Sequence, residues 1–321
     1  MQNIPEREQS VGRLCVAVCV ATFRRPQLLQ NLLYALAQLK FDRVPKPDVR
    51  VIVVDNDAAQ SAKPVCQIPG FPWPIRYVCE PQRGIARARN RAIECADQAD
   101  FFAFIDDDEI PRACWLDELL WAQSQYQADV VSGSVIPAFA EDVPSWIRSG
   151  KFFHRPVFGT GHPLRLCSTN NVLVRARILQ VIPAFDERFN FTGGEDTFFF
   201  LRVREAGFQM VFCREAVVYE PVSTQRANVF WLLRRGFQAG NSWAHCERSL
   251  HPERSVTVLR IFKEIIHIGR GVLEFLASPF LGRAQLFRSL QMLSAGVGTL
   301  AGVVGYRFLP YRNIQERRNP S

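Results

Sequence analysis

The chain has 321 residues, of which 48% are hydrophobic and 22% charged, so a disordered chain and a single small core are both excluded. Its formal net charge of +8 indicates an anionic partner, either nucleic acid, a phosphorylated substrate or acidic lipid, although a basic surplus also serves solubility alone. The nine cysteines form no C-x-x-C pair and several lie in apolar runs, which favours reduced core thiols in the cytoplasm.

The first ten residues are polar and contain no apolar signal core. Beyond them, apolar runs bounded by turn residues predict strands at residues 14–21, 49–54, 75–79, 101–105, 130–136 and 168–174, with one or two more in 210–219. Helical spacing of apolar residues predicts helices at 26–39, 84–95, 111–125, 195–206 and 228–245. This alternation predicts an α/β domain with a mostly parallel sheet flanked by helices. Residues 140–165, rich in Pro, Gly and aromatic residues, are expected to form a long irregular loop.

Polar clusters follow three of the expected strands, at residues 22–26, 55–57 and 106–108. In parallel sheets, ligands bind at the carboxyl ends of the strands, so we expect the three clusters to share one site. Any one cluster could instead be an ordinary strand-to-helix turn, which favours Asp and Asn.

The run Asp106, Asp107 and Asp108 ends a buried strand, where three adjacent carboxylates repel one another. A hard cation such as Mn²⁺ or Mg²⁺ would relieve that repulsion and would share its coordination with substrate phosphate oxygens. The alternative is a solvated acidic helix N-terminus, because Pro111 is expected to begin a helix close by.

Glu195 and Asp196 follow a Gly-Gly pair and open an expected helix. A carboxylate on such a hinge is well placed to act as a general base, although helix capping explains it equally well. Four arginines at positions 83, 87, 89 and 91 could neutralise phosphate or hold the aspartates, although Arg83 and Arg91 could equally lie on a solvated face. The sequence contains no G-x-S-x-G, P-loop or Gly-rich Rossmann turn, which argues against serine hydrolases, P-loop NTPases and dinucleotide-dependent dehydrogenases.

The segment 251–321 differs from the expected catalytic domain at 12–250. It is amphipathic at first, then nearly uncharged at 289–306, and it ends in several arginines. Since residues 289–306 fall short of a spanning length, we expect an in-plane anchor on an acidic membrane. A soluble helical appendage or a homo-oligomer interface through the small residues is the alternative, and a spanning helix is a minority one.

Several short motifs occur together in one order within residues 14–220: 20–26 (VATFRRP), 53–56 (VVDN), 84 with 88–90 (ARN), 104–109 (FIDDDE), 169–175 (TNNVLVR) and 194–196 (GED). With these motifs the chain resembles glycosyltransferase family 2, inverting enzymes of the GT-A fold, and most closely the bacterial enzymes that build surface polysaccharides. The resemblance implies transfer of a sugar from a nucleotide diphosphate to an acceptor hydroxyl.

The resemblance also implies roles for single residues. Thr22, Arg24, Asp55, Arg89, Asp106 and Asp107 would bind the nucleotide sugar. Asp108, with Asp106, would hold the divalent cation, while Asp107 is a spacer within the motif. Asp196, with Glu195 beside it, would be the catalytic base.

The Gln-x-x-Arg-Trp motif of processive members is missing, and only Gln225-Arg226 with Trp231 echoes it, so we expect transfer of a single sugar. The expected acceptor is a saccharide or is lipid-linked, and the expected location is the cytoplasmic face of the inner membrane. Two competing hypotheses are a non-catalytic nucleotide-sugar-binding or membrane scaffold that keeps the fold, and nucleic-acid binding by the basic surplus. No aromatic-basic platform supports the latter, so no nucleic-acid partner is expected.

Overall fold

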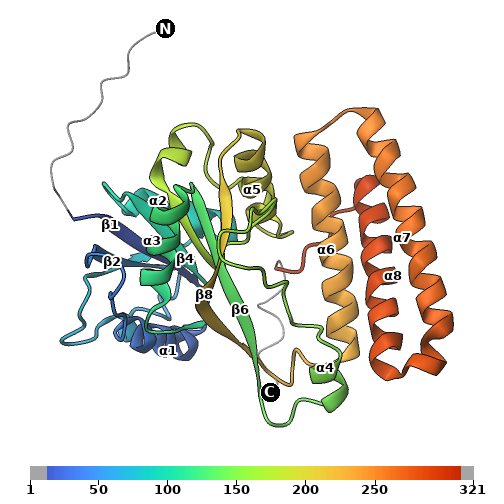
Figure 1. Cartoon of the computed structure of the whole chain (residues 1–321), viewed down its shortest axis with the longest axis horizontal. Coiled ribbons are helices and arrows are strands. Elements are labelled where there is room, and N and C mark those ends of the chain that lie inside the picture. The colour runs from blue at the N-terminus through green and yellow to red at the C-terminus, as the bar shows by residue number, and fades with distance from the viewer. Residues whose placement is uncertain (1–12, 312–321) are drawn as a thin grey trace, which may run out of the picture.

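The computed structural model describes residues 13–311, which form an eight-stranded mixed sheet with helices on both faces and three long helices at one side (Figure 1). The strands are β1 (Cys15–Thr22), β2 (Asp48–Asp55), β3 (Ile75–Cys79), β4 (Phe101–Ile105), β5 (Ile110–Pro111), β6 (Val130–Phe139), β7 (Asn171–Arg175) and β8 (Met210–Val222). The α-helices are α1 (Pro26–Leu36), α2 (Ile85–Cys95), α3 (Trp115–Tyr126), α4 (Ser145–Ser149), α5 (Glu195–Glu205), α6 (Val229–Leu250), α7 (Arg254–Leu281) and α8 (Arg283–Val303). Short 3₁₀ helices lie at Pro64–Cys66, Ala176–Gln180 and Glu187–Phe189.

The strand order is β3-β2-β1-β4-β7-β6-β8-β5. The first four strands run parallel, β7 is antiparallel to both β4 and β6, β8 is parallel to β6, and β5 pairs antiparallel at the edge. The α/β fold expected from the alternation of strands and helices is therefore confirmed. Thr22 and Asp55 are register partners at the ends of β1 and β2, so two of the three polar clusters do meet at one edge.

Alternating residues of β1 separate two cores. Val16, Val18 and Val20 pack in a core with leucines of α1 and α3. Ala17 and Cys19 pack in the other core, with alanines of α2 and phenylalanines of α5. Both faces of the strand are buried, which is why its sequence is a continuous apolar run rather than an alternating one.

The segment after the aspartates differs from the expectation. Ile110 and Pro111 form the short edge strand β5 opposite Tyr219 and Val218, and the next helix begins only at Trp115. Proline cannot donate a backbone hydrogen bond, and an edge strand tolerates this lack as well as a first helical turn does. The reading of the aspartates as a helix N-terminus that begins at Pro111 is therefore wrong.

Residues 210–219, expected as one or two short strands, belong to the single strand β8. Its register against β6 shifts between Gly133 and Ser134. Asn171 holds this irregularity, because its side-chain amide donates to the carbonyls of Ser134 and Ala216, both at 2.9 Å. Its oxygen accepts from the Trp115 indole at 2.7 Å, so each polar group of a buried side chain is paired.

The helices α6, α7 and α8 stand side by side, with α8 between the other two (Figure 1). Helices α6 and α8 pack closely at Gly298, because this residue has no side chain. A Cβ at this position would lie only 2.1 Å from the Phe237 carbonyl oxygen. Ser289, Gly296 and Thr299 of α8 are also buried. The small residues of 289–306 thus face neighbouring helices of the same chain. In the described range 13–311 no helix is long and apolar enough to cross a membrane.

Candidate active site

The three adjacent aspartates lie in three different environments just after β4. The side chain of Asp106 is 44% exposed, that of Asp107 only 6% and that of Asp108 18%. Successive side chains diverge where a strand ends, so one strand terminus can serve three separate contacts.

Asp107 is the structural member of the trio. Thr22 Oγ1 donates to its Oδ2 at 2.7 Å and Arg25 Nη1 donates to its Oδ1 at 3.0 Å. Burial raises the pKa of the Asp107 carboxyl to about 6, with further raising by Asp108 and Asp106, while Arg25 and the Thr22 hydrogen bond oppose the shift. Asp107 thereby ties the end of β4 to the end of β1.

Asp108 lies between two arginines. Its Oδ2 is 3.3 Å from Arg25 Nη1 and 3.4 Å from Arg226 Nη1. Burial and the neighbouring Asp106 raise the pKa of Asp108, and the two guanidinium groups act against that rise. Arg226 is held in turn by Glu220 at 2.6 Å, a residue of β8. Positive charge from two distant segments therefore converges on this carboxylate.

Asp106 is linked to the candidate base region through a buried arginine. Arg89 Nη2 lies 3.3 Å from Asp106 Oδ1, and Arg89 Nη1 donates to Glu195 Oε1. Burial raises the pKa of Glu195 to about 7, and Asp196 adds to the rise while Arg89 opposes it. The Asp106, Arg89 and Glu195 chain joins the two acidic motifs that the sequence places about ninety residues apart.

Asp196 is more exposed than Glu195 at the start of α5. Its Oδ1 accepts from the Thr197 backbone amide at 2.6 Å. The preceding Gly193 and Gly194 have φ of +73° and +93°, which only glycine adopts without strain. This loop packs on α6, where Ser242 Oγ donates to the Thr192 carbonyl at 3.1 Å. Of the two neighbouring carboxylates, Asp196 is the one that solvent reaches.

Asp55 is fully buried at the end of β2. Its oxygens accept from the amides of Asp57 and Ala62 and from the Tyr77 hydroxyl, at 3.1, 2.8 and 3.1 Å. It therefore shapes the loop that follows β2. Arg24 makes an ion pair with Asp57 at 3.2 Å and stacks near Phe23. The neighbouring Arg25, rather than Arg24, is the arginine that reaches the aspartates.

Glu109 and Asn170 brace the turn that carries the aspartates. Glu109 is buried, and its Oε2 accepts from the Asp106 backbone amide at 3.1 Å. Asn170 Nδ2 donates to Glu109 Oε1 at 2.9 Å, and Arg155 donates to Asn170 Oδ1 at 2.9 Å. Burial and the nearby Asp106 raise the pKa of Glu109 well above its ordinary range. The second and third residues of the TNN motif thus serve the aspartate turn and the β6 irregularity respectively.

Sequence reasoning named no role for three residues that the structure brings to this region. Arg25 lies in the polar cluster 22–26, next to Arg24, which the resemblance assigns to nucleotide-sugar binding. Arg226 stands in the loose echo of the processive motif. Tyr311 returns from the end of α8, where Arg83 donates to its carbonyl at 2.9 Å and Gln238 to its hydroxyl at 3.3 Å. No local pattern marks Tyr311, because the fold alone places it.

The acidic groups suit a cation that takes few ligands from the protein. Within residues 13–311, no group of three or more His, Cys, Asp and Glu side chains is arranged to hold a metal ion. Asp106 and Asp108 supply carboxylate oxygens, the donor type that Mg²⁺ and Mn²⁺ prefer, and such ions commonly take one or two carboxylates together with substrate phosphates. The donor set therefore fits a cation that binds together with a diphosphate.

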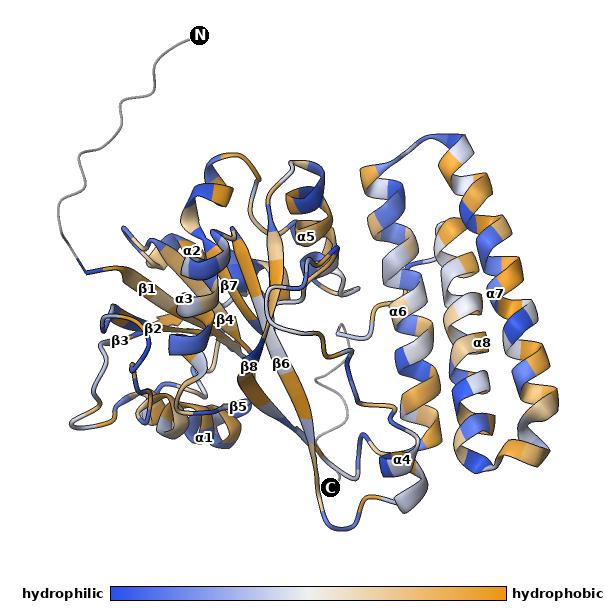
Figure 2. Ribbon diagram, viewed as in Figure 1, coloured by the Kyte–Doolittle hydropathy of each residue, from blue (hydrophilic) through white to orange (hydrophobic). Residues whose placement is uncertain are grey.

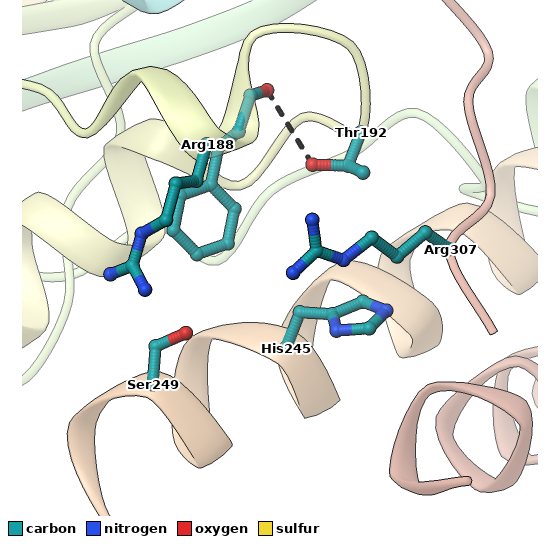
Figure 3. A pocket seen from close by; sticks show the side chains of 6 residues that line it. Arg188, Thr192, His245, Ser249 and Arg307 are labelled. Atoms are coloured by element: carbon teal, nitrogen blue, oxygen red, sulfur yellow. Dashed lines mark hydrogen bonds between the residues drawn. The ribbon is translucent and has the colours of Figure 1, made fainter. Parts of the chain in front are cut away.

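A small hollow beside α6 is too small to bind a nucleotide sugar. Arg188, Thr192, His245, Ser249 and Arg307 line it together with Phe189, around a volume of ≈ 20 Å³ (Figure 3). That is space for about one water molecule. None of the aspartates of the β4 terminus lines it, so a nucleotide site must be sought at the strand ends instead.

Comparison with known proteins now identifies the family. The model of the family described as glycosyl transferase family 2 matches residues 17–182, which is more than half of the chain. The chain is 36% identical over 233 residues to the succinoglycan biosynthesis protein ExoM of Rhizobium meliloti (strain 1021), covering 71% of this chain and 74% of that protein. The protein belongs to glycosyl transferase family 2, and membership makes it a glycosyltransferase of the inverting type.

Solved structures show the same GT-A fold at low sequence identity. S. aureus TarS 1–349 in complex with UDP-GlcNAc superposes with a TM-score of 0.51 at 15% identity, over 92% of this chain and 94% of that one. GalNAc-T7 with UDP, GalNAc and Mn²⁺ superposes with a TM-score of 0.53 at 10% identity, over 76% of this chain and 51% of that one. The expected family and fold are both confirmed.

Proposed function

We propose that this glycosyltransferase moves a single sugar from a nucleotide diphosphate to a saccharide or lipid-linked acceptor during synthesis of a surface polysaccharide. The observation that carries the proposal is the chain of contacts from Asp106 through Arg89 to Glu195, which connects the segment that contains Asp108 with the segment that contains Asp196. It joins a carboxylate pair suited to a cation and diphosphate with an accessible carboxylate suited to proton abstraction. The similarity to a succinoglycan biosynthesis protein supports the polysaccharide role.

On this proposal, Asp196 takes the proton of an acceptor hydroxyl. The acceptor oxygen then forms its bond to the anomeric carbon as the bond from that carbon to the diphosphate breaks, and attack from the opposite side inverts the configuration. A general base of this kind contributes about 10²–10⁴-fold to the rate. Glu195 acts as a positioning residue, since it is buried and engaged by Arg89.

The donor side falls to the strand-end residues. Thr22 and Arg24 lie on the nucleotide side, while Asp55 and Asp107 keep the loops after β2 and β1 in place. Asp106 and Asp108 would hold Mn²⁺ or Mg²⁺, and a solved structural neighbour contains Mn²⁺. When bound, the cation supplies positive charge that stabilises the diphosphate leaving group. Arg25 and Arg226 place two further positive charges beside Asp108.

The lack of the processive motif supports transfer of a single sugar. The net positive charge supports a location at the cytoplasmic face of the inner membrane, whose lipids are anionic. A non-catalytic scaffold that only binds nucleotide sugar is the second candidate. It keeps the donor side but has no need of Asp196.

Two substitutions separate these candidates. Asp108→Asn should abolish Mn²⁺-dependent binding of nucleotide, measured by calorimetry with and without chelator. Asp196→Asn should keep that binding and lose turnover by about 10²-fold or more, measured as nucleotide release. The first nucleotide sugars to test in these assays are UDP-sugars, because two structural neighbours are solved with UDP or a UDP-sugar.

The matched control is Asp97→Asn, the same change at a side chain that is 76% exposed and remote from the site. Full activity in both site variants would refute the proposed mechanism. Normal donor binding with no turnover by the wild type, on any acceptor, would favour the scaffold.

A further inference from the structure

The helix α7 carries an unusual concentration of exposed apolar side chains. All eleven of the following are at least 38% exposed: Val258, Leu259, Phe262, Ile265, Ile266, Val272, Leu273, Phe275, Leu276, Phe280 and Leu281. Phe280 is 91% exposed. Scattered apolar residues are normal on a protein surface, but a contiguous set along one helix marks a surface that contacts something apolar.

Most of these residues form a stripe on the side of α7 opposite its buried residues Glu264, Gly271 and Ser278. Phe262, Ile266, Leu273, Leu276 and Phe280 recur at helical spacing. The opposite side is packed against α8: a Cβ on Gly271 would meet Leu293, and one on Gly296 would meet Ile268. In Figure 2 α7 is the outermost helix, and apolar residues alternate along it with hydrophilic ones.

The charges that border the stripe are mainly basic. Arg254, Lys263, Arg270 and Arg283 are exposed. The two acidic residues within α7 are less available: Glu264 is buried, and Glu274 makes an ion pair with Arg270 at 2.8 Å. An exposed acidic residue, Glu253, precedes the helix.

The apolar stripe and its basic border together discriminate between two possible partners of α7, a second copy of the chain and an anionic phospholipid surface. A second copy of the chain would bring Arg254 and Lys263 against an equally basic stripe, because Glu264 is buried and Glu274 is already ion-paired with Arg270. An anionic phospholipid surface offers acyl chains to the stripe and phosphates to the basic border, where lysine and arginine extend toward the headgroups.

The geometry of α7 favours lying in the membrane plane. The helix has 28 residues and is therefore about 42 Å long. At that length, α7 still does not combine length and apolarity in the way that a membrane-spanning helix requires.

We propose that the outward face of α7 is the surface by which this protein docks on anionic phospholipid membranes. The proposal deepens the membrane association included in the proposed function and rests on it in that respect alone, since it names the helix and the lipid chemistry. It does not depend on which sugar is transferred.

The experiment measures co-sedimentation of the full chain with vesicles of phosphatidylcholine, alone or mixed with phosphatidylglycerol. The wild type should bind the mixed vesicles and bind pure phosphatidylcholine much more weakly. Replacing Leu273, Leu276 and Phe280 by Glu should weaken binding at least about tenfold. Lys263→Gln with Arg270→Gln should weaken binding to the anionic vesicles by about fivefold per charge, with little effect on neutral ones.

Two controls keep the test sharp. Phe230→Glu and Val181→Glu change apolar side chains that are 70% and 63% exposed outside α7, and they should bind vesicles as the wild type does. Thermal unfolding must be unchanged in the α7 variants, as their exposure predicts. Hydrolysis of a nucleotide sugar in solution should also be unchanged, because the substituted side chains lie outside the strand-end site.

The proposal is overturned if the wild type fails to bind anionic vesicles or if the α7 variants bind them normally. It is also overturned if the wild type is a dimer that the α7 variants dissociate, since a second copy would then cover the stripe. A failure of the proposed function appears differently, as loss or absence of sugar transfer with vesicle binding intact.

Discussion

At the scale of residues, three identical side chains in a row have acquired different tasks. Asp106 is exposed and contacts Arg89, Asp107 is buried on Thr22 and Arg25, and Asp108 lies between Arg25 and Arg226. The sequence motif identifies the three aspartates, but it does not indicate which of their carboxylates is buried. That depends on which neighbouring elements each side chain meets after the strand ends.

Asp107 leads to a prediction about pH. Its folded-state pKa of about 6 lies above the ordinary value of 3.8, so the folded protein binds this proton more tightly than the unfolded chain does. The contribution of Asp107 to the free energy of unfolding is therefore largest below about pH 4 and is lost as the pH rises to about 6. Asparagine cannot ionise. Relative to the wild type, Asp107→Asn should gain about 2–3 kcal/mol between pH 4 and pH 7.

Urea unfolding of both proteins across this pH range measures the difference directly. Groups with raised pKa values that do not interact with Asp107 cancel in the comparison because both proteins contain them. Asp97→Asn is the control: because the Asp97 side chain is exposed, this variant should show no such pH-dependent gain in the free energy of unfolding. A constant difference between wild type and Asp107→Asn at all pH values would show that the Asp107 carboxyl is not buried as described.

At the scale of elements, the sequence patterns were most informative where burial is symmetric. The strands β1, β2 and β4 are buried on both faces, and their apolar runs are unambiguous. The patterns were least informative where two elements share a boundary, as at Pro111, whose ring suits an edge strand and a helix start equally. The long strand β8 was underestimated because Arg214 and Glu215 interrupt its apolar run near the register shift.

The α6 and α8 pair gives a prediction about packing. A side chain at Gly298 would overlap the Phe237 backbone, so Gly298→Val must separate the helices and should cost about 1–3 kcal/mol of unfolding free energy. Gly269 on α7 has open space around its Cβ position, so Gly269→Ala should instead stabilise by about 0.5–1 kcal/mol. Chemical denaturation of both variants gives opposite signs if the packing is correct. A tolerated valine at 298 would contradict the close contact.

At the scale of the whole molecule, helices α6 and α8 both contact the α/β domain, and two of these contacts bear on function. The α6 side chain Ser242 bonds the 192–194 loop, and a Cβ on Gly194 would lie 3.1 Å from both Ser242 Cβ and Cys246 Sγ. Near the start of α8, Phe287 packs on Trp146 of α4 at 4.5 Å between ring centroids, and Arg288 donates to the Gly150 carbonyl at 2.8 Å. Helix α6 thus supports the loop before Asp196, while the proposed docking face belongs to α7 in the same group of helices.

This support predicts an effect on turnover without loss of donor binding. Ser242→Leu should push the 192–194 loop outward and displace Asp196, which should lower kcat by about tenfold or more because small displacements of a base are costly. Ser242→Ala removes only the hydrogen bond to Thr192 and should have a much smaller effect. Steady-state kinetics together with nucleotide binding separate the two. Equal loss of kcat and of donor affinity in Ser242→Leu would indicate general damage to the fold instead.

The fold class, the family and the strand-end position of the acidic clusters could all be predicted from the sequence. These follow from local burial patterns and from short motifs, and both are properties of neighbouring residues. The folded arrangement was needed to show that Arg25 and Arg226 share Asp108 and that Glu195 is buried on Arg89 while Asp196 stays accessible. It was also needed to show that α8 is internal while α7 is exposed. Each depends on segments far apart in the chain. Both helices are rich in apolar residues, and what distinguishes them is which one has a neighbour on each side.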